Sequence, residues 1–181
     1  FILDLALALS ARGSIEGRQV GYELLERRSD ALALVDVAIA TRLGHGNDNW
    51  ASVDSFATSV TGPAWRLGAL TDRDLLSWAR SADEWWRRTA LVSAVALNTR
   101  SRGGHGDTRR TLLVCRTVLR GATPMLGKAL SWALRSLVWH DARAVDEFLR
   151  RHGDVLPARV RREVERKLRT NVNEGARSTA R

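Results

Sequence analysis

The sequence predicts an all-α fold arranged as a helical-repeat solenoid with a concave basic face, and three observations lead to this prediction. Ala, Leu and Arg dominate the 181 residues and only three prolines occur, so helix-forming residues fill the chain. Helix-capping residues and glycines recur at short intervals. No segment alternates apolar and polar residues as a half-buried strand would. We expect about ten helices in short-loop pairs that must stack to bury their apolar faces. A globular helical bundle is the alternative.

The first three helices are marked by glycine and serine punctuation. Residues 2–11 form an apolar helix that ends at Gly13, and Ser14 can cap the next helix. A third helix is expected from about residue 30 to residue 43, ending at Gly44.

A polar loop separates these helices from the middle of the chain. Asp48 or Asn49 can cap a helix that starts near Trp50, and Gly62-Pro63 is expected to break that helix. A short helical segment follows over residues 65–70. Ser81 to Glu84 has the spacing of a capping box for a long helix that continues to about Thr99. Caps or first-turn prolines mark the other starts: Asp72, Asp107, Thr123-Pro124, Asp141 and Pro157.

Domain organisation and location follow from length and hydropathy. Residues 1–169 are expected to form a single domain, and residues 170–181 a basic, disordered tail without apolar residues. The apolar start carries Asp4 and lacks a basic segment, so it is interpreted as a helix face rather than a signal peptide. No run approaches the roughly 20 apolar residues of a membrane span. We expect a cytoplasmic monomer, and the missing initiator Met suggests a longer native N-terminus.

Charge and metal-ligand content narrow the function classes. The net charge of +9 favours a polyanionic partner, although an Arg-rich composition of genomic origin is the alternative. Cys115 is the only cysteine and lies among apolar residues, which predicts a buried, unreactive thiol. The four histidines are widely spaced and match no zinc motif. We therefore expect neither a metal nor another cofactor.

Seven tryptophans stand against a single tyrosine. Trp65, Trp78 and Trp139 are expected to fill gaps between helices. Trp50 differs, because it begins a helix after a polar loop and Asp54 follows four residues later on the same face. An indole beside a carboxylate suits a cationic ligand. Taken alone, the pair also fits a core tryptophan beside a solvated acid.

Three segments in order resemble the AlkD-like DNA alkylation repair family. Residues 49–54 (NWASVD) resemble its N-W-x-x-V-D segment, residues 85–91 (WWRRTAL) its W-x-R-R-x-A helix, and residues 128–135 (KALSWALR) its K-A-x-x-W-A-L-R helix. The resemblance covers residues 10–169. It implies a HEAT-like repeat DNA glycosylase that excises cationic alkylated purines, N3-alkyladenine and N7-alkylguanine, from duplex DNA without a cofactor.

The resemblance also implies roles for single residues. Asp54 would be the catalytic carboxylate, and Trp50 and Trp132 would pack against the backbone of the damaged nucleotide. The arginine that holds a phosphate would be Arg88 or Arg87, with Arg88 preferred for its spacing from Trp85. Such a carboxylate would stabilise the positively charged sugar and orient water.

Basic residues supply the expected DNA platform. The candidates for phosphate contact are Arg87, Arg109, Arg110, Lys128 and Arg135, together with part of the Arg-rich last third. The alternative function is a non-catalytic module on the same scaffold that binds branched or distorted DNA. A carboxylate such as Asp54 beside phosphate argues against a pure binder, because it would weaken DNA binding. A protein-interaction scaffold is a third interpretation, disfavoured by the charge and the motifs.

Overall fold

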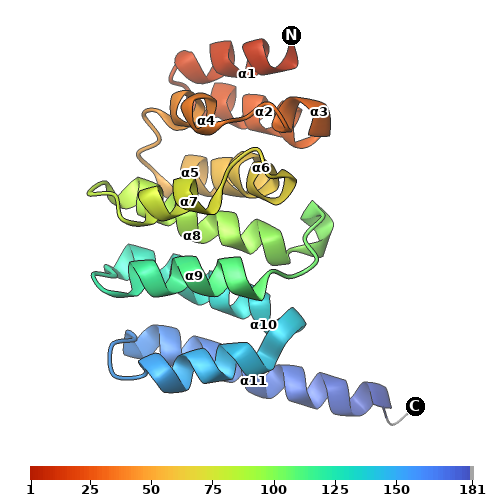
Figure 1. The fold of residues 1–181 in the computed structure, drawn as a ribbon, viewed down its shortest axis with the longest axis vertical. Helices are drawn as coiled ribbons and strands as arrows, with labels where there is room; N and C mark the ends of the chain where they lie inside the picture. The colour runs from red at the N-terminus through yellow and green to blue at the C-terminus, as the bar shows by residue number, and fades with distance from the viewer. Residues whose placement is uncertain (180–181) are drawn as a thin grey trace.

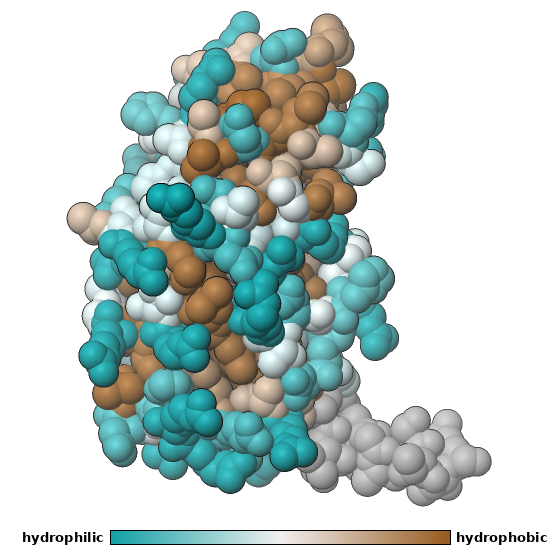
Figure 2. Space-filling view, viewed as in Figure 1, coloured by the Kyte–Doolittle hydropathy of each residue, from teal (hydrophilic) through white to brown (hydrophobic). Residues whose placement is uncertain are grey.

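The computed structural model describes the backbone of residues 1–179 and the side chains of residues 1–170. Helices follow one another over the described residues without any strand, which confirms the predicted all-α helical-repeat fold. They stack in one elongated array, with the N-terminus and the end of α11 at opposite ends (Figure 1). Figure 2 shows apolar side chains gathered over the N-terminal end of this array, and hydrophilic side chains more densely over the other half.

The N-terminal part contains one helix more than the sequence predicts. Its elements are α1 (Ile2–Ala11), α2 (Ile15–Glu26), α3 (Ser29–Leu32) and α4 (Val37–Gly44). The predicted first helix and the Ser14 cap are confirmed. The single helix predicted over residues 30–43 is wrong, because the chain turns between α3 and α4. Asp36 accepts a hydrogen bond from the backbone N–H of Ile39 and caps a new helix there, while Val35 is fully buried.

The predicted break at Gly62-Pro63 is also wrong. Helix α5 (Trp50–Phe56) continues through a π-helical segment (Ala57–Thr61) into α6 (Gly62–Leu67). The N–H of Gly62 donates to the carbonyl of Ala57, five residues earlier. Proline has no N–H to donate, and its ring crowds the preceding turn, so the wider π turn accommodates it inside a continuing helix.

The N-cap of the long central helix lies two residues after the predicted one. Helices α7 (Asp72–Ala79) and α8 (Glu84–Asn98) form the middle of the array. Ser81 and Glu84 do not form the predicted capping box, since Asp83 is the N-cap and accepts from the N–H of Trp85. The Ser81 hydroxyl instead accepts from the N–H of Asp83. A local side-chain turn therefore precedes the helix.

The C-terminal part follows the predicted punctuation. A 3₁₀ turn (Arg100–Arg102) precedes α9 (Thr108–Leu119), α10 (Pro124–His152) and α11 (Ala158–Thr179). Asp107 and Thr123 cap α9 and α10 as predicted. Asp141 lies at a kink within α10 (φ −150°, ψ 74°) and accepts from the N–H of Ala144. Helix α11 continues past the predicted end near residue 169, and residues 180–181 of the predicted tail lie outside the described residues.

One apolar core runs through the array, and α8 lies at its centre in contact with α5, α6, α7, α9 and α10. Trp65 and Trp78 are buried as predicted. Trp139 is not, because 54% of its surface is exposed, and the prediction that it fills a gap between helices is wrong. Cys115 is fully buried as predicted, and this burial raises the pKa of its thiol.

Candidate functional site

The loop that leads into α5 is held in place by α2. The guanidinium of Arg18 donates to the carbonyl of Gly46 at 2.7 Å. The hydroxyl of Tyr22 donates to the carbonyl of Leu43 at 2.9 Å and accepts from the amide of Asn47 at 3.1 Å. The polar loop is therefore a fixed connection, and it sets where α5 begins.

Asn49 starts α5 and so places the two residues singled out from the sequence. Its side chain accepts from the N–H of Ser52 at 3.0 Å, which makes it the N-cap, one of the two alternatives predicted. Trp50 follows with 66% of its surface exposed. Asp54 lies one turn later on the same face of α5. An indole so exposed leaves its ring face open to a ligand instead of contributing to the core.

Asp54 forms a bidentate ion pair with Arg88 of α8. Nε and Nη2 of Arg88 donate to the two carboxylate oxygens of Asp54, each at 2.7 Å. The Arg88 side chain is only 7% exposed and that of Asp54 is 17% exposed. Two parallel hydrogen bonds in this fork geometry fix the plane of the carboxylate. The carboxylate is thus oriented and charge-balanced, and it still reaches the surface beside Trp50.

Arg88 also joins α10. Its Nη1 donates to the carbonyl of Met125 at 3.1 Å, so one guanidinium ties together α5, α8 and the first turn of α10. In this conformation all three of its nitrogens have protein partners, and the phosphate contact implied for Arg88 stays a prediction. Arg87 is half-buried and donates weakly to the carbonyl of Gly121 at 3.4 Å.

Trp132, Lys128 and Arg135 lie along one side of α10. Trp132 is 36% exposed, and Lys128, one turn before it, is exposed as well. Hydrogen bonds hold α10 at both sides: Thr123 bonds Glu84 at the start of α8, and Ser131 donates to Glu163 of α11 at 2.6 Å. The structure thus places Trp50, Asp54 and Arg88 together and Trp132 on the neighbouring helix.

Arg109 and Arg110 lie elsewhere, in an ion-pair network around Asp72. Arg109 donates to this carboxylate at 2.7 Å and Arg110 at 3.0 Å, and the guanidinium of Arg110 also lies over the Trp65 ring. Asn98 at the end of α8 bonds Thr111 of α9, so this network lies near the end of α8 opposite Arg88, about 15 Å further along its axis. Both arginines pair with Asp72 in this structure, and their contact with DNA stays a prediction.

The Asp72 network predicts an acid-dependent stability. Burial opposes the ionisation of Asp72, but the hydrogen bonds from Arg109, Trp65 and Arg110 outweigh it and lower the pKa of this carboxyl. Because the pKa of this carboxyl is lower in the folded chain than its unfolded-state value of about 3.9, its ionisation stabilises the fold above that pH. The stabilisation is lost as the pH falls from the unfolded-state pKa through the pKa of the folded state. Asp72→Asn is expected to reduce the free energy of unfolding by about 1 kcal/mol at neutral pH and by less near pH 3. Urea unfolding at both pH values measures this, and a pH-independent difference would contradict it.

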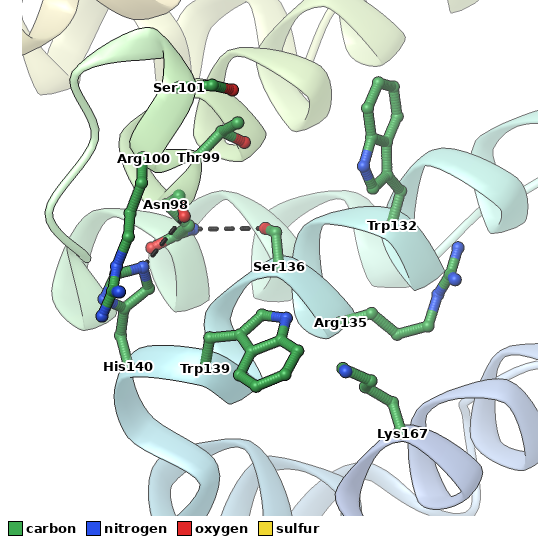
Figure 3. Close-up of a pocket in the computed structure, with 10 residues that line it drawn as sticks. All are labelled: Asn98, Thr99, Arg100, Ser101, Trp132, Arg135, Ser136, Trp139, His140 and Lys167. Atoms are coloured by element: carbon green, nitrogen blue, oxygen red, sulfur yellow. Dashed lines mark hydrogen bonds between the residues drawn. The ribbon is translucent and has the colours of Figure 1, made fainter. Parts of the chain in front are cut away.

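Sequence reasoning missed a group of residues around a cavity of about 720 Å³ (Figure 3). Trp132 and Arg135 line it, as do Trp139, Lys167 and Arg100, whereas Trp50, Asp54 and Arg88 do not. A signal for it exists in the sequence, because Trp132, Arg135 and Trp139 are spaced three and four residues apart and so share one face of a helix. Tryptophan side chains are highly buried on average, and for that reason the sequence alone predicts a core position for Trp139.

None of the helices in the described part of the chain is both long and apolar enough to cross a bilayer. The described residues also bring together no cluster of three or more His, Cys, Asp or Glu side chains that could hold a metal ion.

Comparison with known proteins identifies the family. The family model described as "DNA alkylation repair enzyme" matches residues 1–168, which is nearly the whole chain. Neither the curated proteins nor the solved structures contain a significant match. The matched range includes Trp50, Asp54, Arg88 and Trp132 and agrees with the resemblance seen in their motifs. The chain therefore belongs to the family of DNA alkylation repair enzymes.

Proposed function

We propose that the protein is a monofunctional DNA glycosylase that hydrolyses the N-glycosidic bond of cationic alkylated purines, such as N3-alkyladenine and N7-alkylguanine, in duplex DNA. The observation that carries the proposal is the carboxylate of Asp54, which Arg88 orients and which stays partly exposed beside Trp50. The family supplies the wider setting, the repair of alkylated DNA. We propose further that a single HEAT-like chain acts in the cytoplasm without a cofactor.

The chemistry of a cationic base explains why one carboxylate is sufficient. The bond between C1′ and the base nitrogen breaks with its electron pair going to the base, which thereby loses its positive charge and leaves as a neutral molecule. No general acid is needed. Positive charge develops on the sugar instead, and the fixed carboxylate of Asp54 stabilises it. Water then forms the new bond to C1′ and gives up a proton, which the carboxylate of Asp54 accepts.

Trp50 and Trp132 contribute to the same reaction by packing against the backbone of the damaged nucleotide. An exposed indole face attracts a cation by roughly 0.5–2 kcal/mol, and it offers an apolar surface for a deoxyribose. Both rings have exposed surface that a nucleotide could contact. An open surface of this kind would also admit bulky adducts that a deep pocket excludes.

The proposal is tested by incubating the protein with duplex DNA that contains N7-methylguanine and measuring the free base. Release of the base well above the spontaneous rate supports it. The second candidate is a module that binds branched or distorted DNA without excision. The bidentate pairing is also what this candidate needs, because Asp54 would then serve only to join α5 to Arg88 of α8. Tight binding of branched DNA with no release of base would establish it.

Salt dependence gives a separate prediction for the DNA platform. If about six side chains contact phosphates, the logarithm of the affinity for duplex DNA should fall with the logarithm of salt concentration with a slope of about −5. Lys128→Ala is expected to reduce the magnitude of this slope by about one. Fluorescence anisotropy at several salt concentrations measures both. Arg12→Ala removes an exposed charge at the opposite end of the array and should leave the slope unchanged. A slope near zero for the wild type would contradict DNA binding of either kind.

A further inference from the structure

The cavity of Figure 3 lies between the end of α8, the 3₁₀ turn after it, α10 and α11. Three cationic side chains line it, those of Arg100, Arg135 and Lys167, and its lining includes no carboxylate. In the described part of the chain none of the three has an ion-pair partner within 4.0 Å, although Glu163 lies near enough to Arg135 to interact with it electrostatically. A cavity with this lining attracts an anion.

Trp139 is the unusual member of the cavity. More than half of its surface is exposed, although burial of an indole would stabilise the fold. Lys167 holds it by a cation–π contact, with Nζ at 3.7 Å from the ring centroid. In Figure 3 the ring lies beside the amine of Lys167, with Trp132 and Arg135 further along the same helix. Lys167 thus covers one face of the ring, while more than half of the indole surface stays exposed beside cations, an arrangement that can stack a nucleobase and bind its phosphate.

The floor of the cavity is rigid. The side-chain amide of Asn98 donates to Thr111 at 2.9 Å and to Ser136 at 3.4 Å, and the backbone carbonyl of Asn98 lies 2.9 Å from Nε2 of His140. Gly106 packs so closely on His140 that a Cβ there would lie 2.6 Å from the imidazole. These contacts fix the part of α10 that presents Trp139, so a ligand would meet a preformed surface.

The spacing of the two tryptophans sets the length of the ligand. Trp132 and Trp139 are two helical turns apart, which is about 10 Å along α10. Stacked bases rise about 3.4 Å per nucleotide, so this separation corresponds to about three nucleotides of a stacked strand. A volume of about 720 Å³ also exceeds what a single base would fill. The spacing therefore fits a strand of several nucleotides better than a mononucleotide.

We propose that this cavity binds an unpaired segment of a DNA strand, with one base stacked on Trp139 and phosphates held by Arg100, Arg135 and Lys167. The inference rests on the proposed action on DNA and adds a second contact outside the Asp54–Arg88 pair. An unpaired segment is required because base faces inside a duplex are covered by their neighbours and cannot stack on an indole.

The test measures the binding of an oligothymidylate of about 15 nucleotides by fluorescence anisotropy. Stacking on one aromatic side chain contributes about 1–3 kcal/mol, so Trp139→Ala is expected to weaken single-strand binding by about 5- to 150-fold. Trp139→Phe should restore most of the affinity. A blunt duplex of the same length should lose much less affinity with Trp139→Ala. Val155→Ala, which trims an exposed apolar residue outside the cavity, is the matched control.

Each outcome decides the inference. Unchanged single-strand binding in Trp139→Ala overturns it, and so does an equal loss for single strand and duplex, which would indicate a backbone contact. Competition by thymidine monophosphate as effective as that by the oligonucleotide would indicate a mononucleotide site and also overturns it. Release of N7-methylguanine by the wild type is measured separately. If the wild type releases no base while binding of the oligonucleotide still depends on Trp139, the glycosylase proposal fails and this inference stands.

Discussion

Replacing Asp54 by Asn is expected to lower the rate of base release by at least about 100-fold, equivalent to about 2.7 kcal/mol of transition-state stabilisation. The amide keeps the shape of the side chain and one hydrogen-bond acceptor for Arg88, but it cannot balance positive charge on the sugar. Binding of undamaged DNA should stay the same or tighten, because a negative charge beside the phosphates is removed and Arg88 is left unneutralised. Single-turnover release of N7-methylguanine and anisotropy measure the two effects.

A matched control for this variant lies in the preceding loop. Asp48 is an exposed carboxylate two residues before Trp50, and its contact is to the side chain of Asn49. Asp48→Asn removes the same charge from the same region and should leave the rate of release within about twofold of the wild type. If Asp54→Asn retained the wild-type rate while remaining folded, Asp54 would not be the catalytic carboxylate.

Replacing Arg88 by Ala should give the largest loss of stability of any single substitution at the site. It leaves the carboxylate of Asp54 without its partner and removes the donor to Met125, so α5, α8 and α10 lose their common contact. Removing one member of a buried ion pair costs about 3–5 kcal/mol, and the partial exposure of Asp54 places the expected loss at the lower end. Urea unfolding followed by circular dichroism measures it.

The pair between Arg102 and Glu26 provides the comparison for Arg88. Its N–O distance is also 2.7 Å, but its side chains are 35% and 32% exposed. Arg102→Ala should therefore reduce the free energy of unfolding by about 1 kcal/mol or less. Arg88→Lys keeps the charge without the fork geometry, and we expect it to recover part of the stability but little of the activity. If Arg88→Ala and Arg102→Ala reduced the free energy of unfolding equally, the burial of the Asp54–Arg88 pair would not increase its contribution to stability.

The features that sequence predicted correctly are local ones. Asn49, Asp107 and Thr123 cap their helices because a side-chain oxygen reaches an N–H two or three residues ahead, and nothing distant is required. The spacing of Trp50 and Asp54 on one helix face follows from helical periodicity in the same way.

The features that sequence did not predict depend on contacts between distant segments. The pairing of Asp54 with Arg88 spans 34 residues, and the commitment of Arg109 and Arg110 to Asp72 spans 37 and 38. No local pattern encodes these pairs. The exposure of Trp139 likewise depends on where α11 packs, which places Lys167 over its ring. Such residues define the cavity of Figure 3, and for that reason it was found only in the folded chain.

The π-helical segment between α5 and α6 has a consequence for the rotational phase of the helix. Asp54 and Trp65 are eleven positions apart in the sequence. This separation is close to three full turns of 3.6 residues, so a straight α-helix would direct both side chains to the same side. The additional residue in the wide turn shifts that phase by roughly 100°. Asp54 can therefore reach the surface while Trp65 is fully buried. A deletion of one residue within Ala57–Thr61 would restore regular winding and force either the carboxylate or the indole out of place.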